Sequence, residues 1–359
     1  MMTHARLNRT VSLFAASLAL ALPVHAAEPA AAPDRSWTLQ VENDLFSQFM
    51  GLADSDSDAP DFDGDRGYTQ GLRLGLTLKR DKDLFFIFDW IDDNGLSILG
   101  GGEGDTSVRT KQYFFGQNIY TPKDITVSTP QPDDRPYAAW LYAGGSVARQ
   151  TGRSFEVIEL DVGVMGPMAL GKEVQTTWHD IVNTRHPEGW SNQLRNEPGF
   201  VMTYMIASQL VRYDAGDDTN GFGFDITPHG SVAIGTIYDY VSVGGTARVG
   251  WGRDREIVTP NRIQPSTPGS DWFSPGSFTG YFFVGAEGRF MARNAFLDGN
   301  LFRDSQSVDK HHWVADIVAG AVMFAGDWRL AYTHTFRTEE FHGQEGGQFF
   351  GAVSVTKLF

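Results

Sequence analysis

The stretch Tyr68–Leu78, YTQGLRLGLTL, decides the fold. One side of this stretch, if extended, carries the apolar residues Tyr68, Leu72, Leu74, Leu76 and Leu78. The other side carries the polar or small residues Thr69, Gly71, Arg73, Gly75 and Thr77. A period of two is typical of a β-strand with one apolar and one polar face. Glu156–Val164 and Trp328–Phe336 repeat the pattern.

Twelve segments of this kind follow one another along the chain. They are 36–44, 67–79, 109–118, 138–149, 154–164, 199–213, 221–235, 238–251, 279–291, 311–325, 327–338 and 347–359. Bacterial outer-membrane barrels have an even number of strands, and several of these segments have the length of a tilted membrane strand. Aromatic residues gather near the segment ends, as a membrane-interface girdle requires, at Trp140, Tyr142, Trp251, Trp313 and Trp328. We therefore expect an all-β fold: a single transmembrane antiparallel β-barrel of about twelve strands over residues 36–359, with a soluble periplasmic β-sandwich as the alternative.

The composition excludes several classes of protein. The 359 residues carry a formal charge of −15 and no cysteine. An acidic chain lacks the basic face that nucleic acids require, so we expect no nucleic-acid partner. The lack of cysteine excludes disulfides, thiol catalysis and cysteine-bound zinc. A mean hydropathy of −0.26 excludes a bundle of membrane helices, whereas a barrel averages lipid-facing and lumen-facing residues.

The amino terminus is typical of an exported protein. Residues 1–26 have the pattern of a secretory signal peptide: Arg6 and Arg9 precede an apolar run, and Val24-His25-Ala26 forms a small-residue cleavage site. Residues 27–35, AEPAAAPDR, are expected to form a flexible leader. An exported chain with a barrel pattern is expected to be integral to the bacterial outer membrane.

One segment departs from the period of two. Within Lys172–Asn183, KEVQTTWHDIVN, the apolar residues recur at the spacing of an amphipathic helix. Gln175 and His179 are four residues apart and share one face of it. A short helix between barrel strands is expected either to cap the lumen or to carry a site.

Motifs of nucleophilic hydrolases and of zinc hydrolases do not occur. There is no G-x-S-x-G and no H-E-x-x-H sequence. A lone histidine could act as general base on water, and His179 is the candidate because of its helix. Glu42-Asn43-Asp44 ends the first strand and offers oxygen ligands for Ca²⁺, although turn chemistry would also explain an Asn-Asp pair there.

Eight patches in order resemble the lipid A 3′-O-deacylase family of outer-membrane proteins (LpxR type), from about residue 36 to the C-terminus. They are Glu42–Phe46 (ENDLF), Asp65–Gly71 (DRGYTQG), Gly116–Pro122 (GQNIYTP), Asp134–Trp140 (DRPYAAW), Gln175 with His179, Gly189–Leu194 (GWSNQL), Phe296–Asn300 (FLDGN) and Arg337–Phe341 (RTEEF).

The resemblance implies a twelve-stranded barrel and Ca²⁺-dependent hydrolysis of the ester that holds the 3′-acyloxyacyl chain of lipid A. Its functional residues match Asn43, Asp44, Thr69 and His179. The family's glutamate after the histidine falls by spacing on Arg185, so the nearest carboxylate, Glu188, is assigned to orient the imidazole.

We expect a division of roles among these residues. Asp44 is expected to bind Ca²⁺, with help from Glu42 or from backbone carbonyls near Gly67. Asn43 or Thr69 would donate to the oxyanion, and His179 would take a proton from the attacking water. Because Asp44 shares the polar face of its strand with Glu42, we expect Asp44 and Thr69 to line the barrel interior near one rim.

Two other functions remain open from the sequence. One is a passive barrel, either an outer-membrane channel or an inactive enzyme. The other is an outer-membrane phospholipase, which would need a Ser–His pair on adjacent strands. For the favoured hydrolase, the expected partners are lipopolysaccharide as substrate and the outer-membrane lipids around it, and the expected state is a monomer.

Overall fold

Antiparallel strands form where the alternation predicts them. The computed structural model describes residues 33–44, 46, 66–79, 108–215, 221–251, 256–263, 265 and 268–359. The predicted signal peptide (1–26) and most of the predicted leader (27–35) lie outside the described residues. The strands are β1 (Arg35–Asn43), β2 (Gly67–Lys79), β3 (Val108–Thr121), β4 (Ala138–Thr151), β5 (Ser154–Met165), β6 (Glu197–Ser208), β7 (Val211–Ala215), β8 (Phe222–Gly235), β9 (Tyr238–Trp251), β10 (Gly276–Asn294), β11 (Trp313–Gly326), β12 (Trp328–Arg337) and β13 (Gln348–Leu358).

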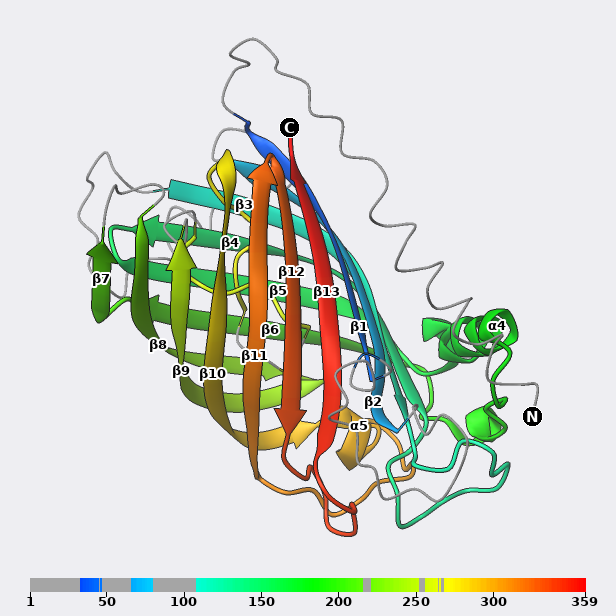
Figure 1. Cartoon of the computed structure of the whole chain (residues 1–359). Helices are drawn as coiled ribbons and strands as arrows, with labels where there is room; N and C mark the ends of the chain where they lie inside the picture. The colour runs from blue at the N-terminus through cyan, green and yellow to red at the C-terminus, as the bar shows by residue number, and fades with distance from the viewer. Residues whose placement is uncertain are drawn as a thin grey trace, which may run out of the picture. The chain divides into compact units, whose positions relative to one another are not determined.

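The sheet closes into a barrel of twelve strands (Figure 1). β1 pairs with both β2 and β13, and β6 pairs with β8, which completes the ring. The short strand β7 pairs only with β8 and stands outside the ring. The predicted strand 199–213 is therefore two strands. β6 ends at Ser208 because its partner Ser154 is the first residue of β5.

The two faces of the barrel wall have opposite chemistry, as the alternation predicts. On β1, Trp37 and Leu39 are 45% and 47% exposed on the outer side. Thr38, Gln40 and Glu42, which alternate with them, are buried in the lumen. The described part of the chain has no helix that is long and apolar enough to span a membrane.

The lumen is filled by paired charges. Asp316, which is fully buried, accepts from Arg337 Nε at 2.9 Å and lies 2.7 Å from Arg289 Nη2. A second buried pair joins Arg73 to Glu159 at 2.8 Å. Burying such charges is tolerable only when each has a partner of opposite sign.

The segment between β9 and β10 adds to this filling. Ile263 donates its backbone N–H to Glu42 Oε1 at 2.9 Å. Asp271 Oδ2 accepts from Gln112 of β3, and Arg329 of β12 binds Glu256 at 2.8 Å. The described residues of this segment thus lie inside the barrel and connect its walls.

The charge network predicts which pairs hold the barrel together. Asp316→Asn should lower the free energy of unfolding by about 3–5 kcal/mol, because the buried Arg289 and Arg337 lose the negative charge that they share. Asp327→Asn removes only the exposed pair with Lys357, at 3.2 Å, and should cost less than about 1 kcal/mol. Both values can be measured by unfolding the protein in lipid vesicles with increasing urea. The folded fraction is read from its heat-modifiable electrophoretic mobility. Equal losses for the two variants would contradict the assigned role of the network.

Candidate active site

A bulge in β2 controls the geometry of the site. The register between β2 and β3 shifts between Tyr68 and Gln70, so Thr69 has no residue opposite it. Tyr68 Oη donates to Glu42 Oε2 at 2.9 Å, which places the Tyr68 ring in the lumen. The prediction that Tyr68 shares the outer face with Leu72 is therefore wrong, because one extra residue reverses the alternation.

The hydroxyl of Thr69 lies on the other side of the wall. Its Oγ1 is 2.7 Å from Oγ1 of Thr121, the last residue of β3. Tyr120 faces the lumen, where its hydroxyl lies 2.6 Å from that of Tyr238, so the next residue, Thr121, takes the outer side. The expectation that Thr69 lines the barrel interior is wrong for the same reason as at Tyr68.

The backbone carbonyl of the bulge residue Thr69 binds the end of β1. Thr69 O accepts from Asn43 Nδ2 at 3.0 Å and from the backbone N–H of Asp44 at 3.4 Å. Asp44 Oδ2 accepts from the backbone N–H of Arg66 at 3.2 Å, and the residue is 6% exposed. The structure thus brings Asn43, Asp44 and Thr69 together at the rim, as the sequence predicts.

Glu42 does not belong to this group. Its Oε1 accepts from Gln40 Nε2 at 2.8 Å and from the backbone N–H of Ile263, and its Oε2 accepts from Tyr68. All of these donors are in the lumen. The prediction that Glu42 helps Asp44 to bind a metal is not supported, because both carboxylate oxygens are already engaged elsewhere.

The donor set around Asp44 suits a hard cation. Ca²⁺ takes oxygen ligands, and the Asp44 carboxylate is one; the paired hydroxyls of Thr69 and Thr121 belong to the same rim. In the part of the chain that the structure describes, no three histidine or acidic side chains converge as metal ligands. The protein groups that fit Ca²⁺ are therefore few, and water or substrate oxygens would complete the shell.

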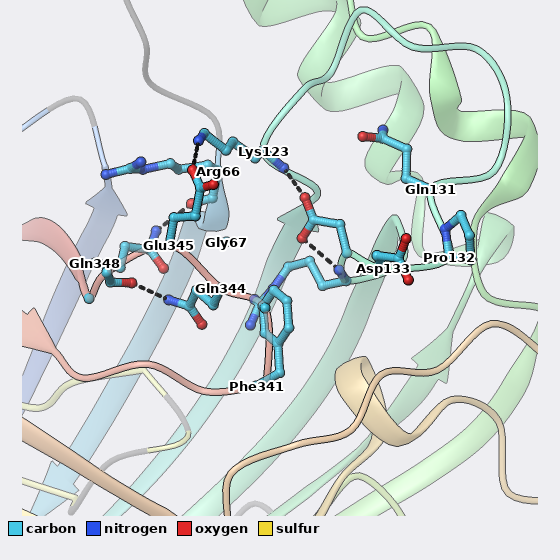
Figure 2. Close-up of a pocket in the computed structure, with 15 residues that line it drawn as sticks. Arg66, Gly67, Lys123, Gln131, Pro132, Asp133, Phe341, Gln344, Glu345 and Gln348 are labelled. Atoms are coloured by element: carbon cyan, nitrogen blue, oxygen red, sulfur yellow. Dashed lines mark hydrogen bonds and ion pairs between the residues drawn. The ribbon is translucent and has the colours of Figure 1, made fainter.

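A cavity of about 300 Å³ adjoins this end of the barrel (Figure 2). It lies between the connection of β3 to β4 and the connection of β12 to β13, and Arg66 is part of its lining. Lys123 and Glu345 form an ion pair across it (Figure 2). Three cationic and three acidic side chains line it, so the cavity has no marked preference for an anion: Arg66, Lys123, Arg135, Asp133, Asp134 and Glu345.

The predicted helix forms and lies outside the barrel wall. After the 3-10 turn η1 (Pro167–Ala169), α4 runs over Gly171–Val182, followed by η2 (Gly189–Asn192) (Figure 1). Trp190 of η2 packs with Ile119 and Ala139, which face outward from β3 and β4. Trp190 Nε1 donates to Gln175 Oε1 at 2.8 Å, which ties α4 to η2. Of the two roles considered for the helix, capping the lumen is thereby ruled out.

His179 is buried on α4 and held by the backbone. Its residue is 1% exposed, and Nδ1 is hydrogen-bonded to the carbonyl oxygen of Arg185. A carbonyl can only accept, so Nδ1 carries the proton and the lone pair of the neutral ring is on Nε2. The chain reaches this position because Asn183 ends the helix in the left-handed conformation, at φ 54°.

Glu188 does not take the role that the sequence assigns to it. Its side chain is exposed, and its backbone N–H donates to Ile125 O at 2.8 Å. The position on which the family's spacing falls, Arg185, does orient the imidazole, but through its carbonyl. The sequence does not predict this contact, because any residue can supply a backbone carbonyl. It does not predict the position of Thr121 beside Thr69 either, because no residue type marks a bulge.

Comparisons with known proteins agree with this fold. The sequence profile of the family "Outer membrane protein LpxR" matches residues 13–359. The structure of LpxR from Salmonella typhimurium superposes with a TM-score of 0.69 at 20% identity, over 90% of this chain and 100% of that chain. The β domain of the Bordetella autotransporter BrkA reaches a TM-score of only 0.41 at 9% identity, over 92% and 100% of the two chains. No curated protein sequence matches the chain.

The profile match extends over almost the whole sequence, and the closed ring of twelve antiparallel strands is the fold of its solved relative. The chain therefore belongs to the LpxR family and is an integral protein of the bacterial outer membrane.

Proposed function

We propose that the protein is a carboxylic ester hydrolase that removes the 3′-linked acyloxyacyl chain of lipid A, with Ca²⁺ and a histidine-activated water. Membership of the LpxR family supports lipid A as the substrate class. The observation that carries the chemistry is the fixed tautomer of His179, buried on a helix against the outer side of β3 and β4.

His179 supplies the base. Because Nδ1 donates to Arg185 O, Nε2 is the atom that accepts a proton from the attacking water. Orientation by a backbone carbonyl keeps the ring in this tautomer without adding a negative charge beside it. The bond between Gln175 and Trp190 holds α4 on the wall, so the imidazole keeps its position relative to β3.

The rim of β1 and β2 supplies hydrogen-bond donors. Thr69 and Thr121 share a hydrogen bond between their hydroxyls, and a hydroxyl can both accept and donate, so this pair is the proposed donor to a substrate oxygen. Asn43 donates from Nδ2 to Thr69 O at 3.0 Å, which holds its amide at the same rim as the second candidate donor. When bound at Asp44, Ca²⁺ would polarise the ester carbonyl and stabilise negative charge on its oxygen.

The filled lumen weighs against a channel. Paired charges from facing walls and the described residues of the β9–β10 segment occupy it, including Asp271 and Glu256. A water-filled pore, as in porins, needs an open lumen.

A conductance measurement in planar bilayers should therefore show no stable open pore.

The first prediction for the proposed activity concerns the base. His179→Gln should lower the rate of 3′-deacylation by about 10²- to 10⁴-fold, because the water loses its proton acceptor. His186→Gln changes an exposed histidine close by in the chain and should leave the rate unchanged. Mass spectrometry of lipid A from cells that express each variant gives the readout.

The same experiment separates the alternatives. Loss of the 3′ acyl chain only with intact His179 supports the proposed hydrolase. Lysophospholipid with unchanged lipid A would identify a phospholipase, and unchanged lipids of both kinds would identify a passive barrel.

A second prediction separates two neighbouring carboxylates. Asp44→Asn should raise the Ca²⁺ concentration for half-maximal activity by about tenfold or more, because the site loses its charged ligand. Glu42→Gln should leave that concentration unchanged, since Glu42 binds donors in the lumen. Titration of purified protein with Ca²⁺ after chelation measures both. A large shift for Glu42→Gln and none for Asp44→Asn would refute the assignment.

A third prediction concerns the orientation of the imidazole. Glu188→Gln should retain activity within about twofold of the wild type, because the Arg185 carbonyl, not a carboxylate, holds Nδ1. Initial rates on purified lipid A in mixed micelles provide the test. A drop as large as that of His179→Gln would show that Glu188 acts on the base after all.

A further inference from the structure

The rim beyond the adjoining ends of β5 and β6 carries four exposed apolar side chains. Met168 and Leu170 lie just before α4, and Leu301 and Phe302 lie between α5 (Ala295–Asp298) and β11. Their exposed fractions are 61%, 48%, 47% and 69%. We call these four residues the apolar rim patch.

A buried carboxylate holds Leu301 and Phe302 of this patch in place. Glu197, the first residue of β6, is 4% exposed and accepts from the backbone N–H groups of Leu301, at 2.9 Å, and Phe302, at 3.2 Å. Asn300 adds two bonds to the backbone of Arg195, at 2.9 and 3.0 Å. The turn is thus clamped to β6 with its two apolar side chains directed away from the protein.

The other half of the patch is attached to the same place. The backbone N–H of Met168 donates to Asn196 Oδ1 at 2.8 Å, one residue before Glu197. Leu170 then begins α4 in the left-handed conformation, at φ 59°. Both halves therefore converge on residues 195–197, where β6 begins.

The patch continues the lipid-facing surface of the barrel wall. Directly along β5 and β6, the cross-strand pair Val162 and Phe200 is 55% and 43% exposed on the outer side, and Met202 is 49% exposed. These wall residues face membrane hydrocarbon in an outer-membrane barrel. Four further apolar side chains held beyond the strand ends would be costly in water and favourable in acyl chains.

We propose that the apolar rim patch is a membrane-docking surface, immersed in the acyl chains of the adjoining lipid leaflet. On this side of the barrel the hydrocarbon layer then rises past the ends of β5 and β6 to the start of α4. The helix that carries His179 is thereby set against lipid acyl chains rather than in bulk water. The docking itself does not depend on the proposed enzymatic activity.

The cysteine-free chain allows a direct test. Single variants Met168→Cys, Leu301→Cys and Phe302→Cys are spin-labelled and reconstituted into phospholipid vesicles. Electron paramagnetic resonance then compares collisions with oxygen, which concentrates in hydrocarbon, and with a water-soluble nickel chelate. Phe200→Cys is the hydrocarbon control. Asp309→Cys is the water control, since its side chain is 86% exposed in the same connection as Phe302.

Labels on the patch should give oxygen-to-nickel collision ratios close to that of Phe200→Cys and well above that of Asp309→Cys. Heat-modifiable electrophoretic mobility confirms that each variant is folded. Ratios equal to that of Asp309→Cys would overturn the proposal. Dipolar coupling between labels on different molecules would also overturn it, because a second copy of the chain would then cover the patch.

Discussion

The bulge at Thr69 is the constraint on which the rest of the site depends. It turns Tyr68 into the lumen, where the phenol binds Glu42, and it places the Thr69 hydroxyl beside Thr121 on the outer side. Its carbonyl also holds Asn43 and Asp44. Without the extra residue, the polar groups at this rim would point to the opposite sides of the wall. One inserted residue thus separates the packed interior from the outer side, where the proposed site lies.

The inner and outer sides of the barrel wall have different roles. Inside, Asp316 pairs with arginines, and both carboxylate oxygens of Glu42 accept hydrogen bonds from neutral donors. Outside, α4 packs on apolar residues of β3 and β4 and keeps His179 out of solvent. The proposed chemistry therefore lies where lipid can approach laterally, and the lumen serves stability.

The sequence predicts most of the fold because a period of two is read directly from side chains. Eleven of the twelve ring strands and the helix with His179 lie within about three residues of their predicted bounds, and the exception, 199–213, divides into β6 and β7. The sides of Tyr68 and Thr69 could not be predicted, since a bulge leaves the composition of a strand unchanged. The assignment of Glu188 as the partner of His179 was wrong for a related reason. The partner is the backbone carbonyl of Arg185, and a backbone carbonyl cannot be recognised from residue type. The functions of Asn43, Asp44 and His179 remain predictions that rest on family resemblance and on their geometry.

The central claim is that the substrate reacts on the outer side of the wall, beside α4. Photo-crosslinking with lipid A that carries a photoreactive group on its 3′ acyl chain tests this most directly, with crosslinked peptides identified by mass spectrometry. The account predicts crosslinks to the outward-facing residues Gln117, Ile119 and Thr121 of β3 and to residues 168–179, which lie against the outer side of β3 and β4. Crosslinks concentrated on residues 256–263 and 268–273, inside the barrel, would contradict it.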